Sequence, residues 1–190
     1  DATYSGKAIK PSISVSYNGT ILRENIDYKV SFANNIKVAQ SSSSKPPTVK
    51  ITGIGTFQGS LVKTFSIVPY ELSDERIQNG VITVTTTDLL YSAGKPRYSK
   101  VSVKVGSKVL VKDVDYTLSY ANVTQVADVD DPNPPTVTIT GKGNYSGSLE
   151  RNYRIYAKDI GTMSYSKIAS LIYTGKELKP SVMIKDKAAN

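Results

Sequence analysis

One stretch of this chain is written twice. Residues 6–67 align with residues 94–155 at a constant separation of 88 positions and without a gap, so the turn GIGTFQG at 53–59 recurs as GKGNYSG at 141–147. A third copy begins at Tyr173 and echoes the sequence from Tyr4. Such periodicity indicates a repeating structural unit and limits the fold more than any single residue does. We call residues 6–67 the first copy and residues 94–155 the second copy.

Apolar and polar residues alternate inside each copy, which is the pattern of a half-buried β-strand. In the first copy the apolar pairs are Ile13 and Val15, Val30 and Phe32, Val49 and Ile51, and Phe65 and Ile67. Asn-Gly and Gly-Ser dipeptides mark turns between the strands. We expect a helical turn only over residues 72–78. Five to seven short strands in a unit of this size predict an all-β chain of small antiparallel β-sandwiches.

Lys63 and Arg151 occupy equivalent positions on the apolar side of the last long strand of each copy. A lysine or arginine at such a position packs its aliphatic stem and extends its charge to water. We therefore predict that this strand lies at a sheet edge in both copies.

The repeat predicts three tandem segments: 1–68, 69–157 and a truncated third at 158–190. Residues 71–90 are expected to supply the first strand of the second segment, and residues 159–172 to begin the third. The first segment has no such leading strand, and the chain reads as a piece of a longer protein. We therefore expect strand complementation, with a strand-swapped homo-oligomer as one route.

Composition excludes several kinds of chemistry. The chain has no cysteine and no histidine, which excludes disulfides, thiol nucleophiles, histidine-based metal sites and histidine-dependent catalysis. No apolar run is long enough to span a membrane, and no signal-peptide pattern follows Asp1. The net charge of +8 is spread along the chain without a dense basic block. We expect no cofactor, no membrane insertion and no nucleic-acid partner.

The glycine-rich turn at 141–147 has three interpretations: a phosphate cradle, a sugar-binding loop or a structural turn. A phosphate cradle needs a following helix N-terminus, whereas a strand pattern follows here. Phe57 takes the place of Tyr145 in the first copy, so the phenol hydroxyl is dispensable at that position. We predict a structural turn in which the aromatic ring covers the end of the sandwich.

With these residues in hand, the chain resembles a bacterial Ig-like repeat of Gram-positive cell-surface proteins. The resemblance rests on Tyr4 to Lys7, Lys10-Pro11, Asp27-Tyr28, Asn34-Asn35, residues 48–59 and residues 65–67, and on their counterparts in the second copy. It departs at the extra residue Ala93 and in the longer connection before each Pro-Pro-Thr strand. It implies tandem Ig-like β-sandwiches in an exported adhesin or wall-anchored protein, and it implies no particular ligand.

The loop DVDDPN supplies a candidate calcium site. Its oxygen ligands would come from Asp128, Asp130, Asp131 and Asn133. The first copy has serines there, and the loop lacks the spaced pattern that ends in a glutamate. A solvated acidic loop is the alternative interpretation.

Two further chemistries have their ingredients in both copies. An intramolecular Lys–Asn isopeptide bond would use Lys7 or Lys95, Asn34 or Asn122, and Asp27 or Asp115. Glycoside hydrolysis would need two acids in one cleft, and the acids in register are Asp27 with Asp115 and Glu71 with Asp159. All these residue types also suit turns and strand starts, and we expect no catalysis.

Thirteen tyrosines are the remaining lead. Most recur at strand positions and are expected in the core. Four do not recur as aromatic residues and are candidates for binding a sugar or a protein surface: Tyr17, Tyr70, Tyr98 and Tyr165.

These observations favour a non-enzymatic module of a secreted or wall-associated bacterial surface protein, acting as a stalk or as an adhesin repeat. The alternative is a carbohydrate-binding module of an extracellular glycan-degrading enzyme. A third hypothesis is recognition of a host protein by adding a strand at an open sheet edge. The partners would accordingly be a host glycan, a host protein or a second copy of the chain.

Overall fold

A computed structural model describes residues 1–185 of the chain. It is nearly all β, with 4% of residues in helix and 38% in strand, so the predicted all-β class is confirmed. Residues 186–190, the end of the predicted third segment, lie outside the described residues. In the described chain, no helix has the length and apolar character that crossing a bilayer requires.

Backbone contacts divide the chain into two compact units. The first unit consists of Asp1–Thr85, Val101–Ser119 and Thr138–Arg151. The second consists of Thr86–Lys100, Tyr120–Val137 and the chain from Asn152 onward. The predicted segment boundaries at residues 68 and 157 stay a prediction.

The strands are short and follow one another closely. The elements up to the helix are β1 (Ala2–Thr3), β2 (Ser16–Tyr17), β3 (Thr20–Ile21), β4 (Tyr28–Ala33), β5 (Thr48–Gly53), β6 (Ser60–Thr64), β7 (Ile67–Val68), β8 (Tyr70–Leu72) and α1 (Asp74–Gln78). After it come β9 (Ile82–Thr85), β10 (Leu89–Leu90), β11 (Ser102–Val105), β12 (Lys108–Val109), β13 (Tyr116–Ala121), β14 (Thr136–Gly141), β15 (Tyr145–Asn152), β16 (Ile155–Tyr156), the 3₁₀ turn η1 (Ile160–Thr162), β17 (Ser164–Tyr165) and β18 (Ile184–Lys185). The helical turn expected at 72–78 is thus α1.

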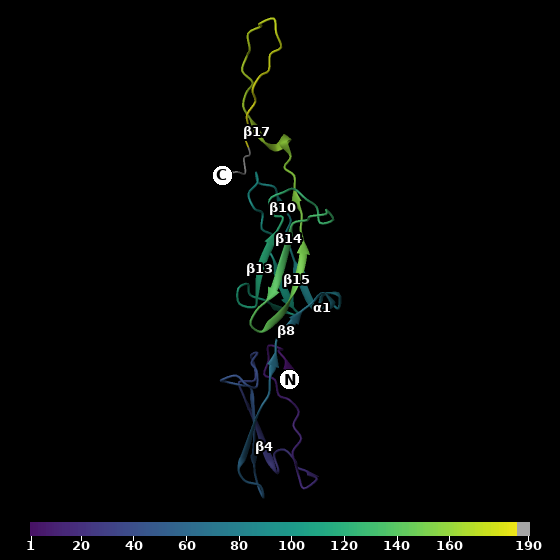
Figure 1. Cartoon of the computed structure of the whole chain (residues 1–190), viewed down its shortest axis with the longest axis vertical. Helices are drawn as coiled ribbons and strands as arrows, with labels where there is room; N and C mark the ends of the chain where they lie inside the picture. The colour runs from purple at the N-terminus through teal and green to yellow at the C-terminus, as the bar shows by residue number, and fades with distance from the viewer. Residues whose placement is uncertain (186–190) are drawn as a thin grey trace. The chain divides into compact units, whose positions relative to one another are not determined.

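Two sheets carry the longest strands. In the first copy β4, β5 and β6 form an antiparallel sheet in that order. In the second copy β13, β14 and β15 lie side by side in a four-stranded sheet, and Figure 1 labels these three strands. The fourth strand is β8, which pairs parallel to the start of β15 through Tyr145↔Tyr70 and Gly147↔Leu72.

The segment before the second copy supplies strands to it, as predicted for residues 71–90. β9 pairs antiparallel with β11 over four residue pairs, from Ser102↔Thr85 to Val105↔Ile82. β10 pairs parallel with β16. In the first copy the strand equivalent to β11 is β2, which pairs over two residues with its hairpin partner β3. We call residues 70–85, which include β8, α1 and β9, the cover segment.

The edge-strand prediction is right for one copy and wrong for the other. β6 ends its sheet, and Lys63 on it is exposed. β15 lies between β14 and β8, because the cover segment pairs along its first residues. Arg151 lies beyond that pairing, and its guanidinium forms a 2.7 Å ion pair with Asp74 of α1.

A buried apolar cluster holds the first unit together. Its members are Tyr4, Ile67, Leu72, Ile82, Val103, Leu110, Tyr116, Ile139, Tyr145 and Leu149. Apolar and polar residues alternate along the strands, and the apolar ones enter this cluster because one side of each strand faces the core. The cluster contains Tyr4 and Ile67 from the N-terminal part of the chain together with residues of the cover segment and of the second copy.

The second unit has its own buried residues. Tyr153 and Ile155 are almost fully buried, and the Tyr153 hydroxyl donates to the carbonyl of Arg97 at 2.7 Å. Ser99, also buried, accepts from the Thr87 amide and donates to the Thr87 carbonyl, both at 2.8 Å. These bonds satisfy polar groups that burial would otherwise make costly.

Candidate functional site

Three tyrosines meet in the first unit. The ring of Tyr145 packs edge-on against Tyr4, with centroids 5.6 Å apart, and against Tyr70, with centroids 6.2 Å apart. Tyr4 follows β1, Tyr70 begins β8 and Tyr145 begins β15. Edge-to-face pairs of this kind contribute about 0.5–1.5 kcal/mol each beyond the area they bury.

Lys108 lies beside this cluster. Its ammonium donates to the Tyr145 hydroxyl at 3.0 Å and lies 4.0 Å from the carboxylate of Asp115. The hydrogen bond to Tyr145 raises the pKa of Lys108 above its usual range. Burial raises the pKa of the Tyr145 hydroxyl. Both groups therefore keep their protons at neutral pH, and the pair acts as a fixed contact.

Asn144 completes the cluster by accepting two hydrogen bonds. Its side-chain oxygen accepts from the Val38 amide at 3.0 Å, and its carbonyl accepts from the Tyr70 amide at 3.0 Å. Val38 belongs to the first copy and Asn144 to the second. We use the name joint for Tyr4, Val38, Tyr70, Lys108, Asn144 and Tyr145. All six lie in the first unit.

The joint explains the glycine-rich turn at 141–147. Tyr145 is 4% exposed, so its ring is buried as predicted. A Cβ on Gly141 would overlap the backbone of Ser146, and one on Gly147 would overlap the carbonyl oxygen of Leu72. The turn is therefore structural, and its glycines allow β8 to approach the backbone closely.

Sequence reasoning missed Lys108 and Asn144. Their equivalents in the first copy, 88 positions earlier, are Thr20 and Thr56. A change of residue between two otherwise matching copies was the signal that could have found them. A contact between the copies involves different positions in each copy, so the residues that form it need not recur.

The four predicted ligand-binding tyrosines lie on separate elements. Tyr17 in β2 packs edge-on against Phe57, and Tyr98, before β11, lies tilted against Tyr120. Tyr70 is half-buried in the joint, where its ring also contacts the guanidinium of Arg76. Tyr165 in β17 is 77% exposed. The rings of Tyr17, Tyr98 and Tyr70 thus contact other side chains of the chain. The proposed role of the four tyrosines in binding stays a prediction.

The acidic loop has a partner of its own. Asp128 forms a 2.6 Å ion pair with Arg154, which holds the pKa of that carboxyl below its usual range. Asp131 accepts from the Asp128 amide at 2.7 Å. Among residues 1–185 no group of three or more acidic side chains is placed to hold a metal ion, and Asp130 and Asn133 are exposed.

The residues considered for isopeptide or carboxylate chemistry have local contacts. The side-chain amides of Asn34 and Asn122 donate to the carbonyls of Pro46 and Pro134, each at 3.2 Å. The carboxylates of Asp27 and Asp115 accept from backbone amides four residues earlier. Asp159 accepts from the Gly161 amide at 2.8 Å. These are the turn roles that their residue types favour.

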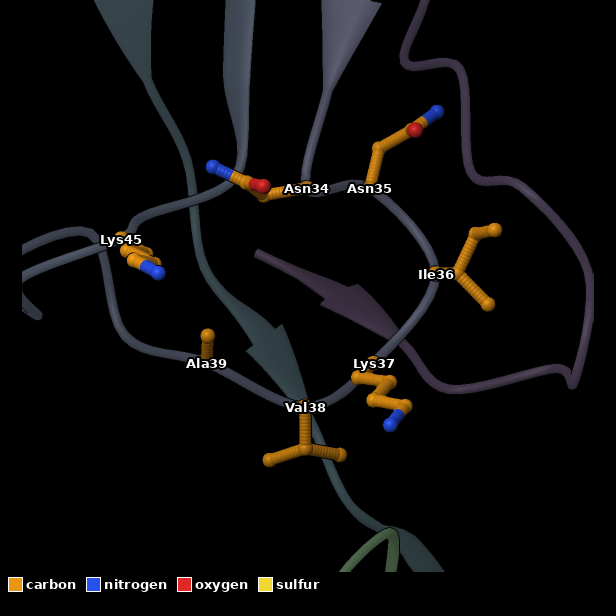
Figure 2. Close-up of a pocket in the computed structure, with 7 residues that line it drawn as sticks. All are labelled: Asn34, Asn35, Ile36, Lys37, Val38, Ala39 and Lys45. Carbon is orange, nitrogen blue, oxygen red and sulfur yellow. The ribbon is translucent and has the colours of Figure 1, made fainter.

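One pocket of the described residues lies beside the loop after β4. Figure 2 shows residues 34–39 curving round it, with Lys45 on the other side. Its volume is about 440 Å³. The side chains of Ile36 and Val38 point away from its centre in this view, and the Asn35 amide donates to the Ile9 carbonyl at 2.7 Å. A ligand site requires polar side chains that converge on a common point, and the polar side chains of this pocket do not.

Comparisons of the chain with known protein families, with curated proteins and with solved structures find no match.

Proposed function

We propose that this chain is a non-enzymatic structural or adhesion module of a secreted or wall-associated bacterial surface protein, in which Ig-like repeats serve as a stiff spacer. One observation carries the proposal: in the joint, the ring of Tyr4, which precedes the first copy, packs against Tyr145 of the second copy, and the Val38 amide of the first copy donates to the side chain of Asn144 in the second copy. The bacterial surface location rests on the sequence resemblance alone.

The contacts of the joint are strong enough to keep it closed. One aromatic pair, Tyr4 with Tyr145, and one hydrogen bond, from the Val38 amide to Asn144, link the N-terminal part of the chain to the second copy, and at about 0.5–1.5 kcal/mol each they give about 1–3 kcal/mol. Each 1.4 kcal/mol changes an equilibrium about tenfold. A joint of this strength is closed in most molecules, and stiffness is what a spacer needs.

The absence of cysteine makes a direct test simple. Spin labels on cysteines introduced at the exposed residues Lys29 and Lys104 would lie in the first and second copies, within the same unit. Double electron–electron resonance then measures the distribution of distances between the labels. A narrow distribution is expected, and a broad one in the otherwise unchanged chain would refute the spacer proposal.

A matched pair of variants isolates the joint. Tyr4→Ala with Asn144→Ala removes one ring and one side-chain acceptor from it, and should broaden the distribution. Tyr91→Ala with Thr56→Ala changes the equivalent positions, which lie outside the joint, and should leave the distribution narrow. Equal broadening by both pairs would attribute the effect to general loosening and contradict the proposal.

A further inference from the structure

The tyrosine rings of the joint border a small pocket in the first unit. The pocket has a volume of about 90 Å³ and is lined by Tyr4, Ser5, Tyr70, Val105, Lys108 and Tyr145. It is open to solvent at Ser5, which is exposed, and at Lys108, whose side chain is 46% exposed. Sites for whole small molecules have volumes of about 300–1,000 Å³. This pocket therefore suits one small chemical group.

The residues that the second copy contributes to this pocket differ from their equivalents in the first copy. The equivalent pairs, first copy then second, are Thr20 and Lys108, Phe57 and Tyr145, and Tyr17 and Val105. In the first copy the ring of Tyr17 packs edge-on against Phe57, with centroids 5.7 Å apart. In the second copy the smaller Val105 leaves space beside Tyr145. The space and the polar groups that border it are therefore found together, and only the second copy combines them.

Hydrogen bonds leave the hydroxyls of the pocket as donors. The Tyr145 hydroxyl accepts from the Lys108 ammonium at 3.0 Å, and the Tyr70 hydroxyl accepts from the Arg76 guanidinium at 3.2 Å. Within residues 1–185 neither hydroxyl donates to a protein acceptor. A lysine ammonium has three N–H bonds, so Lys108 has donors beyond the one that Tyr145 uses. The pocket therefore offers N–H and O–H donors to a group that enters it.

The charged groups at the pocket sum to one positive charge. Lys108 and Arg76 are cations that contact its hydroxyls, and the Asp115 carboxylate lies 4.0 Å from the Lys108 ammonium. Cation–π contacts hold the ammonium in place, 5.1 Å from the ring centroid of Tyr145 and 5.7 Å from that of Tyr4. A ligand with one negative charge and acceptor oxygens matches these donors, because hydrogen bonds between charged groups are the strong ones. A carboxylate is a small group of that kind.

We propose that this pocket binds the carboxylate group of a small organic acid or of an acidic sugar. The carboxylate oxygens accept from the Lys108 ammonium and from the hydroxyls of Tyr70 and Tyr145. Tyr4 and Ser5 line the same pocket, so the ligand links the N-terminal part of the chain to the second copy and adds to the contacts that close the joint. The inference rests on the proposed function, because it gives the adhesion module a class of ligand.

Titrations of the full chain with sodium acetate and with sodium glucuronate, each up to about 100 mM, test the proposal by two-dimensional heteronuclear NMR. Sodium chloride keeps the ionic strength constant, so that general screening does not change during a titration. Acetate should shift the backbone amides of the residues that line the pocket, and the shifts should saturate. A lower dissociation constant for glucuronate would identify the ligand as an acidic sugar, and an equal or higher constant would identify it as a small organic acid.

Two variants give the pocket the residues of the first copy: Lys108→Thr and Tyr145→Phe. Loss of the charged hydrogen bond in Lys108→Thr should raise the dissociation constant about tenfold or more, and loss of a neutral donor in Tyr145→Phe should raise it a few-fold. Lys104→Gln is the control, because it also removes one positive charge but Lys104 is exposed on β11 and lies outside the pocket. Its constant should match that of the unchanged chain. The NMR spectrum of each variant also shows whether it is folded.

Amide shifts that do not saturate with either salt would overturn the proposal. Equal weakening by Lys104→Gln and Lys108→Thr would overturn it as well, because binding would then follow the overall charge. The distance distribution between spin labels is measured without a ligand. A narrow distribution in a chain that binds neither salt would therefore refute the carboxylate site and leave the spacer proposal intact.

Discussion

Two leucines at equivalent positions should differ sharply in their contribution to stability. Replacing Leu149 by alanine removes three carbons from a site that is 1% exposed. At about 0.8 kcal/mol per methylene the transfer cost is about 2.4 kcal/mol, and the cavity raises it to about 3–5 kcal/mol. Leu61 is 52% exposed, so Leu61→Ala loses about half the transfer energy, about 1 kcal/mol, and leaves no cavity.

Urea unfolding can resolve this difference. Both leucines belong to the first unit, so their effects appear in the same transition. With a slope of about 1–3 kcal/mol per molar urea, Leu149→Ala should lower the midpoint by about 1 M or more, and Leu61→Ala by about a third of that shift. The chain has no tryptophan, so tyrosine fluorescence and far-ultraviolet circular dichroism report the transition.

Equal midpoint shifts for the two variants would refute the reasoning. They would mean that the cover segment does not protect the second copy, because position 149 would then be no better buried than position 61.

Three other outcomes are expected. Gly147→Ala should lower the melting temperature more than Gly59→Ala, since both have positive φ but only position 147 meets a backbone oxygen; equal losses in calorimetry would contradict this. The pKa values of Lys108 and Tyr145 are raised in the folded state, so their contribution is complete below their usual values of 10.5 and 10.0 and is lost as the pH rises through the folded values. Urea midpoints between about pH 8 and about pH 11 should therefore fall less in Tyr145→Phe than in the unchanged chain; an identical fall would contradict it. The pKa of Asp128 is lowered from its usual 3.8, so its contribution is complete above that value and lost as the pH falls through the folded value; thermal melts of Asp128→Asn should depend less on acid pH, and unchanged dependence would be the contrary result.

The repeat and the strand pattern could be predicted from the sequence because both depend on local order. β4 and β13 begin at residues 28 and 116, and β5 and β14 at 48 and 136, which is the spacing of 88 read from the sequence. The burial of Tyr145 also followed from its place in a turn between apolar strands. The turn chemistry of Asp27 and Asn34 is local as well.

The joint could not be predicted in this way. Tyr70 does not recur, so it was read as a free surface residue, but β8 pairs with β15 and brings its ring against Tyr145. That pairing links residues 75 positions apart, and no local pattern encodes it. Lys108 and Asn144 were missed because they differ from their counterparts in the first copy. The pairing of β8 with β15 also explains why the edge-strand prediction was wrong for β15, because β8 occupies that edge of the sheet.

The order of the cover segment and its copy has a consequence for folding during synthesis. Residues 70–85 precede residues 94–155 in the chain, so a ribosome completes the cover before it makes the strands that the cover protects. Domains made N-terminus first are exposed to aggregation while their apolar strands wait for later partners. Here β11 and β15 emerge when their partners β9 and β8 are already available, and each can pair at once. A chain written in this order protects the second copy with residues that are already made.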